Sequence, residues 1–393
     1  MIITVRKTYK YRLYRSKRDG RLHDQINIAG IIWNHITALQ RRYYRFTGKH
    51  ISEGRLKAHV AKLRMRRKKF AYWRLVGSQA VQDIIERHEK TYVRFFNKQG
   101  GLPRFRKVKK FKSITLKQAG WKLEDAVPGK KYRKIRIGKT NYKFVYHRPF
   151  WGEIKTVTIK RDTAGRLWIC FSVVEKMVVG DGNSTGKIGA FDFGLKHFLT
   201  NHEGQLIEAP QFFRSDLPRL RKIQRQVSKK IIGSNNKKEG VRHIARRHIR
   251  ISDKRLNFHF QLAHDLCDQY DVMLFEDLNI AAMKRLWGRK VSDLGFSQFI
   301  KVLEWVAMKR GKSVKFIDRW ERTTGKCSTC GHEQKLELKD RVFECGNCGL
   351  GLDRDHNAAK NILEAGHRLM LSQAEEDHAK VRHPALTSEA QDL

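Results

Sequence analysis

Hydrophobic and polar residues alternate near the start of the chain, over residues 4–14 (TVRKTYKYRLY). A period of two predicts a half-buried strand with a basic outer face. The apolar side of this strand is formed by Val5, Tyr9, Tyr11 and Leu13. The same alternation returns in residues 155–174, where KTVTIKR and LWICFSVV flank a turn at 162–165. This second pattern predicts a β-hairpin.

Between these strands, apolar residues recur every three or four positions, which predicts helices. One such run includes Ile28, Ile32, Ile36 and Leu39, and another includes Val81, Ile84, Ile85, Tyr92 and Phe95. The basic run KAHVAKLRMRRKKFAYWR lies between them; a solvated helix face explains its charges, and its aromatic residues could also stack on bases. Strands on both sides of a helical insertion predict a small β-barrel that carries a helical domain.

The second half of the chain shows a different pattern. The stretch GDGNS at 180–184 is typical of a linker, and IGAFDFG, HFLTN and GQLIE then predict short strands. Residues 237–269 carry a long amphipathic helical stripe, and DVMLFED is a continuous apolar run typical of a fully buried strand. A helix over 296–309 and the strand SVKFID follow. Alternating helices and strands predict an α/β domain with a mixed sheet.

The charge of the chain is unusual for a folded protein. Its 393 residues include 83 Lys and Arg against 39 Asp and Glu, a formal net charge of +44. Such a surface is best neutralised by a polyanion, so nucleic acid is the predicted partner and an acidic membrane surface the alternative. No stretch of about 18 apolar residues exists that could span a bilayer, and basic residues interrupt the N-terminal segment where a signal peptide would be apolar. These features predict a cytoplasmic protein.

Four of the six cysteines form one cluster. Cys327 and Cys330 are separated by two residues, as are Cys345 and Cys348. A glycine directly follows each pair, at Gly331 and Gly349, and can form a tight turn there. Two such loops can place four thiolates around one tetrahedral Zn²⁺. In a reduced compartment this spacing predicts one structural zinc site with no open position for catalysis.

Three acidic residues stand out in a chain that is poor in acids. Asp192 follows an apolar strand, Glu276 ends the buried strand, and Asp355 lies in DRDHNAAKNIL after the cysteine cluster. Each has an ordinary explanation, because Asp192 suits a turn and Asp355, like Asp277 beside Glu276, could cap a helix. Together they predict a site for two Mg²⁺ ions, which prefer oxygen ligands and can activate water at a phosphodiester.

At these residues the sequence resembles the TnpB proteins of bacterial and archaeal transposons, which are relatives of the type V CRISPR single-effector nucleases. The resemblance rests on GAFDFGLKHFLT around Asp192, LFEDLNI around Glu276, and TTGKCSTCG, ECGNCG and DRDHNAAKNI near the end. The first half matches more loosely, through KTYKYRLY, the WNH around Asn34, QAVQDIIERHEKTYVRFF and GLPRFRK.

The resemblance implies a RuvC-like nuclease domain with an RNase H-like fold and an inserted zinc ribbon, and a wedge β-barrel with an inserted helical recognition domain. On that basis we expect the wedge barrel at 1–20 and 98–180, with the recognition domain at 21–97. A linker at 181–186 is expected to precede the RuvC-like domain at 187–325. The zinc ribbon should span 326–350, the last RuvC segment 351–366, and a flexible tail 367–393.

The resemblance also assigns roles to residues. It implies that Asp192, Glu276 and Asp355 are catalytic ligands of two Mg²⁺ ions, with Asp353 as the fallback for the third. It implies that the four cysteines bind zinc, and it places Gln82 on a helix that faces a short DNA motif. Phe193 departs from the family, which often has a small or aliphatic residue there; no ligand is removed by this change.

The implied activity is RNA-guided, magnesium-dependent cleavage of double-stranded DNA beside a short flanking motif, by a prokaryotic protein that is nucleoid-associated when bound to DNA. A guide RNA and target DNA are thus the expected partners, no membrane is involved, and a monomer is favoured. Two alternatives stay open: an RNA-guided repressor that does not cut, and an RNA-independent zinc-ribbon factor that aids transposition.

Overall fold

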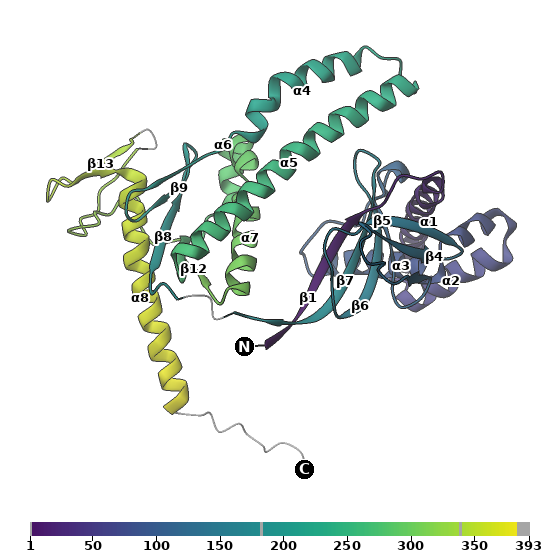
Figure 1. Cartoon of the computed structure of the whole chain (residues 1–393), viewed down its shortest axis with the longest axis horizontal. Helices are drawn as coiled ribbons and strands as arrows, with labels where there is room; N and C mark the ends of the chain where they lie inside the picture. Colours follow the sequence, from purple (N-terminus) through teal and green to yellow (C-terminus); the bar gives the residue numbers. More distant parts are fainter. Residues whose placement is uncertain (1, 181–183, 338–339, 383–393) are drawn as a thin grey trace. The chain divides into compact units, whose positions relative to one another are not determined.

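The computed structural model describes residues 2–180, 184–337 and 340–382 and shows two compact units (Figure 1). The N-terminal unit comprises Ile2–Met177 together with Val241–Ala245, and the C-terminal unit comprises Val178–Gly240 and the chain from Arg246 onward. The described helices include none that is both long and apolar enough to cross a membrane.

The N-terminal unit combines two antiparallel sheets with helices. One sheet has the order β1-β7-β6-β2 and the other β3-β4-β5. Their strands are β1 (Ile2–Arg12), β2 (Ser113–Leu116), β3 (Trp121–Leu123), β4 (Tyr132–Ile137), β5 (Thr140–Val145), β6 (Glu153–Arg161) and β7 (Leu167–Val178). The helical segments are α1 (Asp19–Thr47), α2 (Glu53–Arg66), η1 (Lys68–Leu75), α3 (Ser78–Phe96) and η2 (Val108–Lys110).

These elements confirm the predicted N-terminal strand, hairpin and helices. An isolated bridge between Leu13 and Phe144 connects the two sheets, and the core between sheet and helices is built from side chains such as Tyr11, Ile32 and Trp73. Strand β2 lies at an edge of the first sheet and β3 at an edge of the second, and these two described strands do not pair with each other. The closed barrel therefore stays a prediction.

The C-terminal unit contains a mixed five-stranded sheet with the order β10-β9-β8-β11-β12. Strands β8, β11 and β12 are parallel, whereas β9 runs antiparallel to β8 and β10. The strands are β8 (Ile188–Phe193), β9 (His197–Asn201), β10 (Leu206–Glu208), β11 (Val272–Glu276) and β12 (Ser313–Ile317). A separate hairpin is formed by β13 (Val342–Glu344) and β14 (Gly351–Asp353).

Helices cover both faces of this sheet. The helices of the unit are α4 (Phe212–Ser228), α5 (Asn235–Gln269), α6 (Ile280–Leu294), α7 (Phe296–Lys309) and α8 (Arg354–Arg382), and α4 extends away from the sheet. On one face Phe191 and Phe275 pack against residues of α5 and α7, such as Leu262 and Phe299. On the other face Ala190 and Leu274 pack against Ile362 of α8. A strand covered on both faces explains the continuous apolar run of β11.

The expected tail from residue 367 is wrong for residues 367–382, because α8 continues without a break to Arg382. Gly366 packs so closely on β11 that a Cβ atom there would lie 2.2 Å from Leu274 Cδ1. The segment after Gly366 is polar and has no apolar period, but it is rich in residues that favour a helix, such as Leu, Met, Gln, Ala and Glu. The first part of α8, which packs on the sheet, provides the nucleus from which the helix continues through this segment. Residues 383–393 of that predicted tail, like 181–183 of the predicted linker, lie outside the described residues.

A buried histidine should make the C-terminal unit sensitive to acid. His259 is fully buried, its Nε2 lies 2.9 Å from the Leu294 carbonyl oxygen, and burial lowers its pKa to about 4. The unfolded chain binds a proton near pH 6.5, so the stability that neutral His259 provides is lost as pH falls from about 6.5 towards 4. We expect the free energy of unfolding in urea to drop by roughly 1–2 kcal/mol more between pH 7 and 5 than in His259→Gln. Equal drops in both proteins would contradict this role.

Candidate active site and metal centre

The parallel strands β8 and β11 bring Asp192 and Glu276 to the same edge of the sheet. The two strands pair in register up to Phe191 and Phe275, and each acidic residue is the next one along its strand. Neighbouring strands lie about 4.8 Å apart. The carboxyl ends of these two strands therefore place the two acids side by side.

Both acidic side chains project to the face of the sheet that α8 covers. Side chains alternate along a strand, and Ala190 and Leu274, two residues before each acid, pack against α8. Asp355 lies in the first turn of that helix. Its Oδ2 would lie 3.4 Å from a Cβ atom placed on Gly194, just after β8. The start of α8 thus brings the third carboxylate to the end of β8.

The three predicted carboxylates line one cavity of about 1240 Å³ in the C-terminal unit. Basic side chains also line it, and they belong to Lys196, Arg214, Arg289, Lys290, Arg341 and Arg354. The aromatic residues on its wall are Phe193, Phe213 and Trp287. Basic side chains that can bind phosphates and aromatic side chains that can stack on bases suit the walls of this cavity to a nucleic-acid strand.

The carboxylates of Asp355 and Glu276 raise the affinity of Asp192 for positive charge. Burial raises the pKa of Asp192 well above its usual value, and the negative charges of Asp355 and Glu276 raise it further. Burial also raises the pKa of Glu276, while a hydrogen bond from Thr323 opposes this. Arg354 offsets part of the negative charge through an ion pair with Asp355, 3.2 Å from Nη2 to Oδ1. A divalent cation would offset more of it, and carboxylate oxygens are the ligands that Mg²⁺ prefers.

Neighbouring acids have other roles. Asp353, the fallback for the third ligand, caps α8: its Oδ1 accepts hydrogen bonds from the backbone N–H groups of Asp355 and His356, at 2.9 and 3.3 Å. Asp277 forms an ion pair with Arg319 instead of capping a helix. Gln82 is exposed on α3 in the N-terminal unit, and its contact with DNA stays a prediction.

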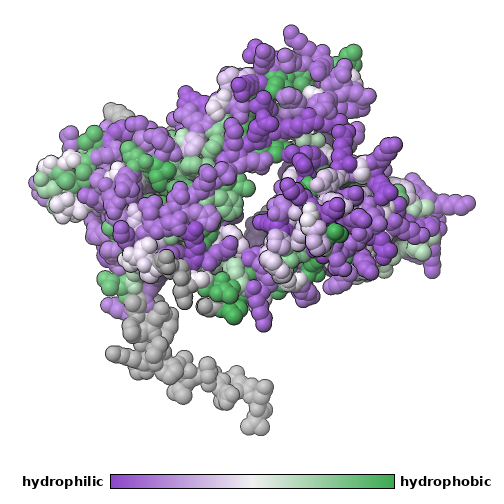
Figure 2. Space-filling view, viewed as in Figure 1, coloured by the Kyte–Doolittle hydropathy of each residue, from purple (hydrophilic) through white to green (hydrophobic). Residues whose placement is uncertain are grey.

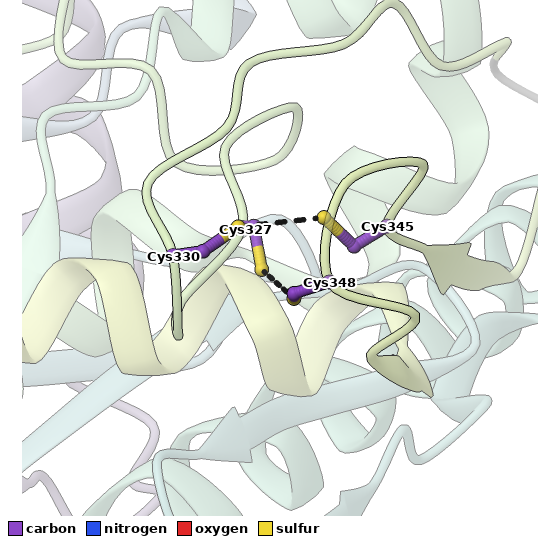
Figure 3. A group of neighbouring side chains, drawn as sticks. All are labelled: Cys327, Cys330, Cys345 and Cys348. Atoms are coloured by element: carbon purple, nitrogen blue, oxygen red, sulfur yellow. Dashed lines mark hydrogen bonds between the residues drawn. The ribbon is translucent and has the colours of Figure 1, made fainter.

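The four cysteines meet at one point (Figure 3). Their Sγ atoms all lie within 4.8 Å of one another, and Cys327–Cys348 and Cys330–Cys345 are 3.6 Å apart. A tetrahedral zinc ion with bonds of about 2.3 Å requires sulfur atoms about 3.8 Å apart. Within the described part of the chain, this is the one group of three or more His, Cys, Asp or Glu side chains whose ligand atoms all lie within 4.8 Å of one another. The carboxylate oxygens of Asp192, Glu276 and Asp355 are further apart than this.

Each cysteine pair lies on a tight turn of the same geometry. The backbone N–H of Gly331 donates to the Cys327 carbonyl, and that of Gly349 to the Cys345 carbonyl, both at 3.0 Å. The two glycines have φ of 73° and 72°, in the left-handed region that glycine adopts readily. Two equivalent turns that direct four thiolates inward fit a structural zinc site, as the spacing predicted.

Two buried asparagines, which the sequence analysis did not single out, join the cysteine cluster to the carboxylates. Asn357 accepts from the backbone N–H of Ser328 at 3.0 Å and donates to the Lys326 carbonyl at 2.7 Å. Asn361 donates to the carbonyls of Thr323 and Lys326, both at 2.7 Å. These side chains of α8 therefore hold the first cysteine turn against the helix that begins with Asp355. Their positions in the DRDHNAAKNIL motif were visible, but their contacts were not.

Parts of the chain are similar to known proteins. Residues 174–286 match the OrfB_IS605 family model, described as "Probable transposase", and residues 296–362 match the Cas12f1-like TNB domain. A TnpB-like protein of Acanthamoeba polyphaga mimivirus is 31% identical over 231 residues, 54% of this chain and 43% of that protein. The chain is thus similar in sequence to TnpB proteins and to the OrfB_IS605 family. Asp192 and Glu276 lie in the region matched by OrfB_IS605, and Asp355 and the four cysteines in the TNB match.

One relative extends over nearly the whole chain. A protein of Streptomyces pristinaespiralis, named as a candidate RNA-guided DNA endonuclease, is 29% identical over 374 residues, 93% of this chain and 90% of its own. The solved structure of the mini-RNA-guided endonuclease CRISPR-Cas_phi3 superposes with a TM-score of 0.52 at 10% identity, covering 92% of each chain. At this identity the superposition shows a shared fold only. The chain itself has a mixed α/β fold with a four-cysteine cluster.

Proposed function

We propose that this chain is a TnpB-like, RNA-guided DNA endonuclease that cleaves target DNA by magnesium-dependent hydrolysis. The observation that carries the proposal is the convergence of Asp192, Glu276 and Asp355, from two strand ends and a helix start, on one cavity with basic walls. The names of relatives that extend over most of the chain support the same activity.

The order of the five-stranded sheet supports a RuvC-like domain. Counted along the chain, β8 to β12 lie in the order third, second, first, fourth, fifth, and only the second strand is reversed. This is the arrangement expected of an RNase H-like fold. We infer that the N-terminal unit provides the wedge and recognition domains, and that the four-cysteine domain is the inserted zinc ribbon.

The carboxylates fit two Mg²⁺ ions, because they supply oxygen ligands and their mutual repulsion needs a compensating charge. Asp192, Glu276 and Asp355 would together hold these ions. When bound, the ions would activate a water and stabilise the leaving oxygen of the phosphodiester. The basic residues on the cavity wall, including Arg214 and Lys290, would hold the phosphates of the strand on either side of the cut.

Target choice would come from a bound guide RNA. The net charge of +44 gives the chain the capacity to bind the phosphates of an RNA and of an RNA–DNA heteroduplex. Base pairing would then specify the sequence, and the protein would read only a short flanking motif. A repressor that binds without cutting is less well supported, since all three carboxylates are present in the cavity.

Copurification and a plasmid library test the proposal. The purified chain should carry a defined RNA species, and with that RNA it should linearise plasmids from a library with a randomised flank next to the guide's target. Cleavage should need Mg²⁺ and stop with EDTA. Binding without cleavage would identify a repressor, and the absence of any defined RNA would favour the RNA-independent transposition factor.

A further inference from the structure

The helices α4 and α5 form a basic arm that ends in an apolar tip. Residues 212–255 contain fifteen Lys and Arg against three Asp and Glu. The two helices pack against each other, because Gly240 is so close to Val227 that a Cβ atom there would lie 2.5 Å from Cγ2. Figure 1 shows them side by side, extending beyond the sheet of the C-terminal unit.

The turn between the helices exposes two isoleucines. Ile231 and Ile232 expose 81% and 88% of their surface, which with Trp320 makes them the most exposed large hydrophobic residues in the described part of the chain. In Figure 2 the visible face of the arm is mostly hydrophilic, with hydrophobic residues at its far end. Single exposed apolar residues are ordinary, but an adjacent pair at the end of a basic arm is not.

Hydrogen bonds hold this turn in one conformation. The Ser234 side chain caps α5 by accepting from the Lys237 backbone N–H at 3.1 Å, and its hydroxyl donates to the Ile231 carbonyl at 2.8 Å. Lys237 Nζ donates to the Lys230 carbonyl at 2.9 Å. Gly233 has a φ of 88°, which reverses the chain. The isoleucines are therefore presented by a built turn, not by an irregular loop.

We propose that this tip is an apolar wedge that enters double-stranded DNA between two base pairs while the basic arm binds the flanking phosphates. Proteins that kink DNA insert aliphatic side chains in this way, and unstacking one step costs a few kcal/mol that phosphate contacts can offset. The inference goes beyond the proposed cleavage, since it concerns a surface without any of the three carboxylates.

The distribution of charge favours DNA over a membrane. An α5 of 35 residues is about 52 Å long, and its basic residues, with those of α4, are spread along the arm. A flat lipid surface entered by the tip would contact only the basic residues next to it. A duplex kinked at the tip can bend its flanks towards the arm, and this brings phosphates, about one charge per 1.7 Å of axis, to basic residues further along.

Two variants of the full chain, purified with any RNA it carries, separate the wedge from the charge. The first is Ile231→Ser with Ile232→Ser, and the second is Lys222→Gln with Lys229→Gln. Leu371→Ser removes a different exposed aliphatic side chain, 66% exposed on α8, and serves as the control. The probes are a DNA duplex with one 2-aminopurine, an RNA duplex of the same sequence, and vesicles of phosphatidylcholine with phosphatidylserine.

We expect the double isoleucine variant to bind the DNA duplex about tenfold more weakly at 150 mM salt, with an unchanged salt dependence and melting temperature. It should also lose the rise in 2-aminopurine fluorescence that the unchanged protein produces on unstacking. The lysine variant should keep that rise, but its slope of log affinity against log salt should fall by about 0.9 per lysine. DNA binding and fluorescence equal to those of the Leu371→Ser control would overturn the proposal. The proposal would also be overturned if the double isoleucine variant lost binding only to the vesicles or only to the RNA duplex.

Discussion

Replacing Asp192 by Asn should reduce DNA cleavage at least about 1000-fold and leave RNA-directed DNA binding within about twofold. Asn keeps the shape of the side chain but removes the charge that a divalent ion needs, and metal-assisted phosphodiester hydrolysis depends on several kcal/mol of such stabilisation. The phosphate contacts that give affinity come from basic residues elsewhere, so binding is not affected. Cleavage and binding are measured on the same labelled duplex, with and without Mg²⁺.

The same variant should be more stable than the unchanged protein when divalent ions are absent. Burial and two neighbouring carboxylates raise the pKa of Asp192, so the folded state holds its proton more tightly than the unfolded state. Stability from this group is therefore present below the unfolded pKa, about 3.9, and is lost as pH rises through the folded pKa. In EDTA at neutral pH, Asp192→Asn should melt at a higher temperature, and Mg²⁺ should raise the melting temperature of the unchanged protein more than that of the variant.

Asp353→Asn is the matched control for this experiment. Asp353 caps α8 through its Oδ1 and is not among the residues that line the carboxylate cavity. Asn caps a helix about as well as Asp, so cleavage should be unchanged. Loss of cleavage in Asp353→Asn with full activity in Asp355→Asn would transfer the third ligand to Asp353. Loss of DNA binding together with cleavage in Asp192→Asn would show that Asp192 supports the fold instead of the chemistry.

The elements that place the first two carboxylates could be predicted because their patterns are local. The continuous apolar run of β11 indicates a strand covered on both sides, and the helical period of 296–309 defines α7 at the same bounds. An acid directly after such a strand marks the edge of a sheet. The spacing of the cysteines likewise predicts their cluster, because two-residue separations restrict how four thiolates can meet.

Features that depend on packing between distant segments could not be predicted. Helix α4 was missed although Leu217, Leu220 and Val227 recur at helical spacing, because Pro218 lies inside the segment and a proline usually ends or interrupts a helix. The strands β3 to β5 are short and carry basic residues on their exposed positions. The contacts of Asn357 and Asn361 were hidden for another reason: both lie inside α8, and only the fold shows that their side chains bond to a separate loop.

Removing zinc should stop cleavage, even though the zinc site is closed and lies apart from the carboxylates. In Cys327→Ser one ligand of a structural site is weakened, and such sites contribute about 10–16 kcal/mol of apparent binding energy to the folding of a small domain. The turn around Lys326 would then no longer hold Asn357 and Asn361, and Thr323, which donates a hydrogen bond to Glu276, would lose its anchor. We expect zinc content to fall well below one ion per chain and cleavage to fall at least about 100-fold, the upper end of the effect of supporting contacts on metal sites.

A second variant tests whether Asn357 and Asn361 position the carboxylates, independently of zinc binding by the four cysteines. Asn357→Ala with Asn361→Ala should keep about one zinc ion per chain but still lose about tenfold or more in cleavage, with a higher Mg²⁺ concentration needed for half-maximal rate, because Asp355 and Glu276 are less well positioned. Cys170→Ser, which changes a cysteine in β7 far along the sequence from the cluster, should keep both zinc and cleavage. Full cleavage by zinc-free Cys327→Ser would mean that the carboxylates are held without the ribbon, since the two strand ends and the first turn of α8 would then suffice to position them.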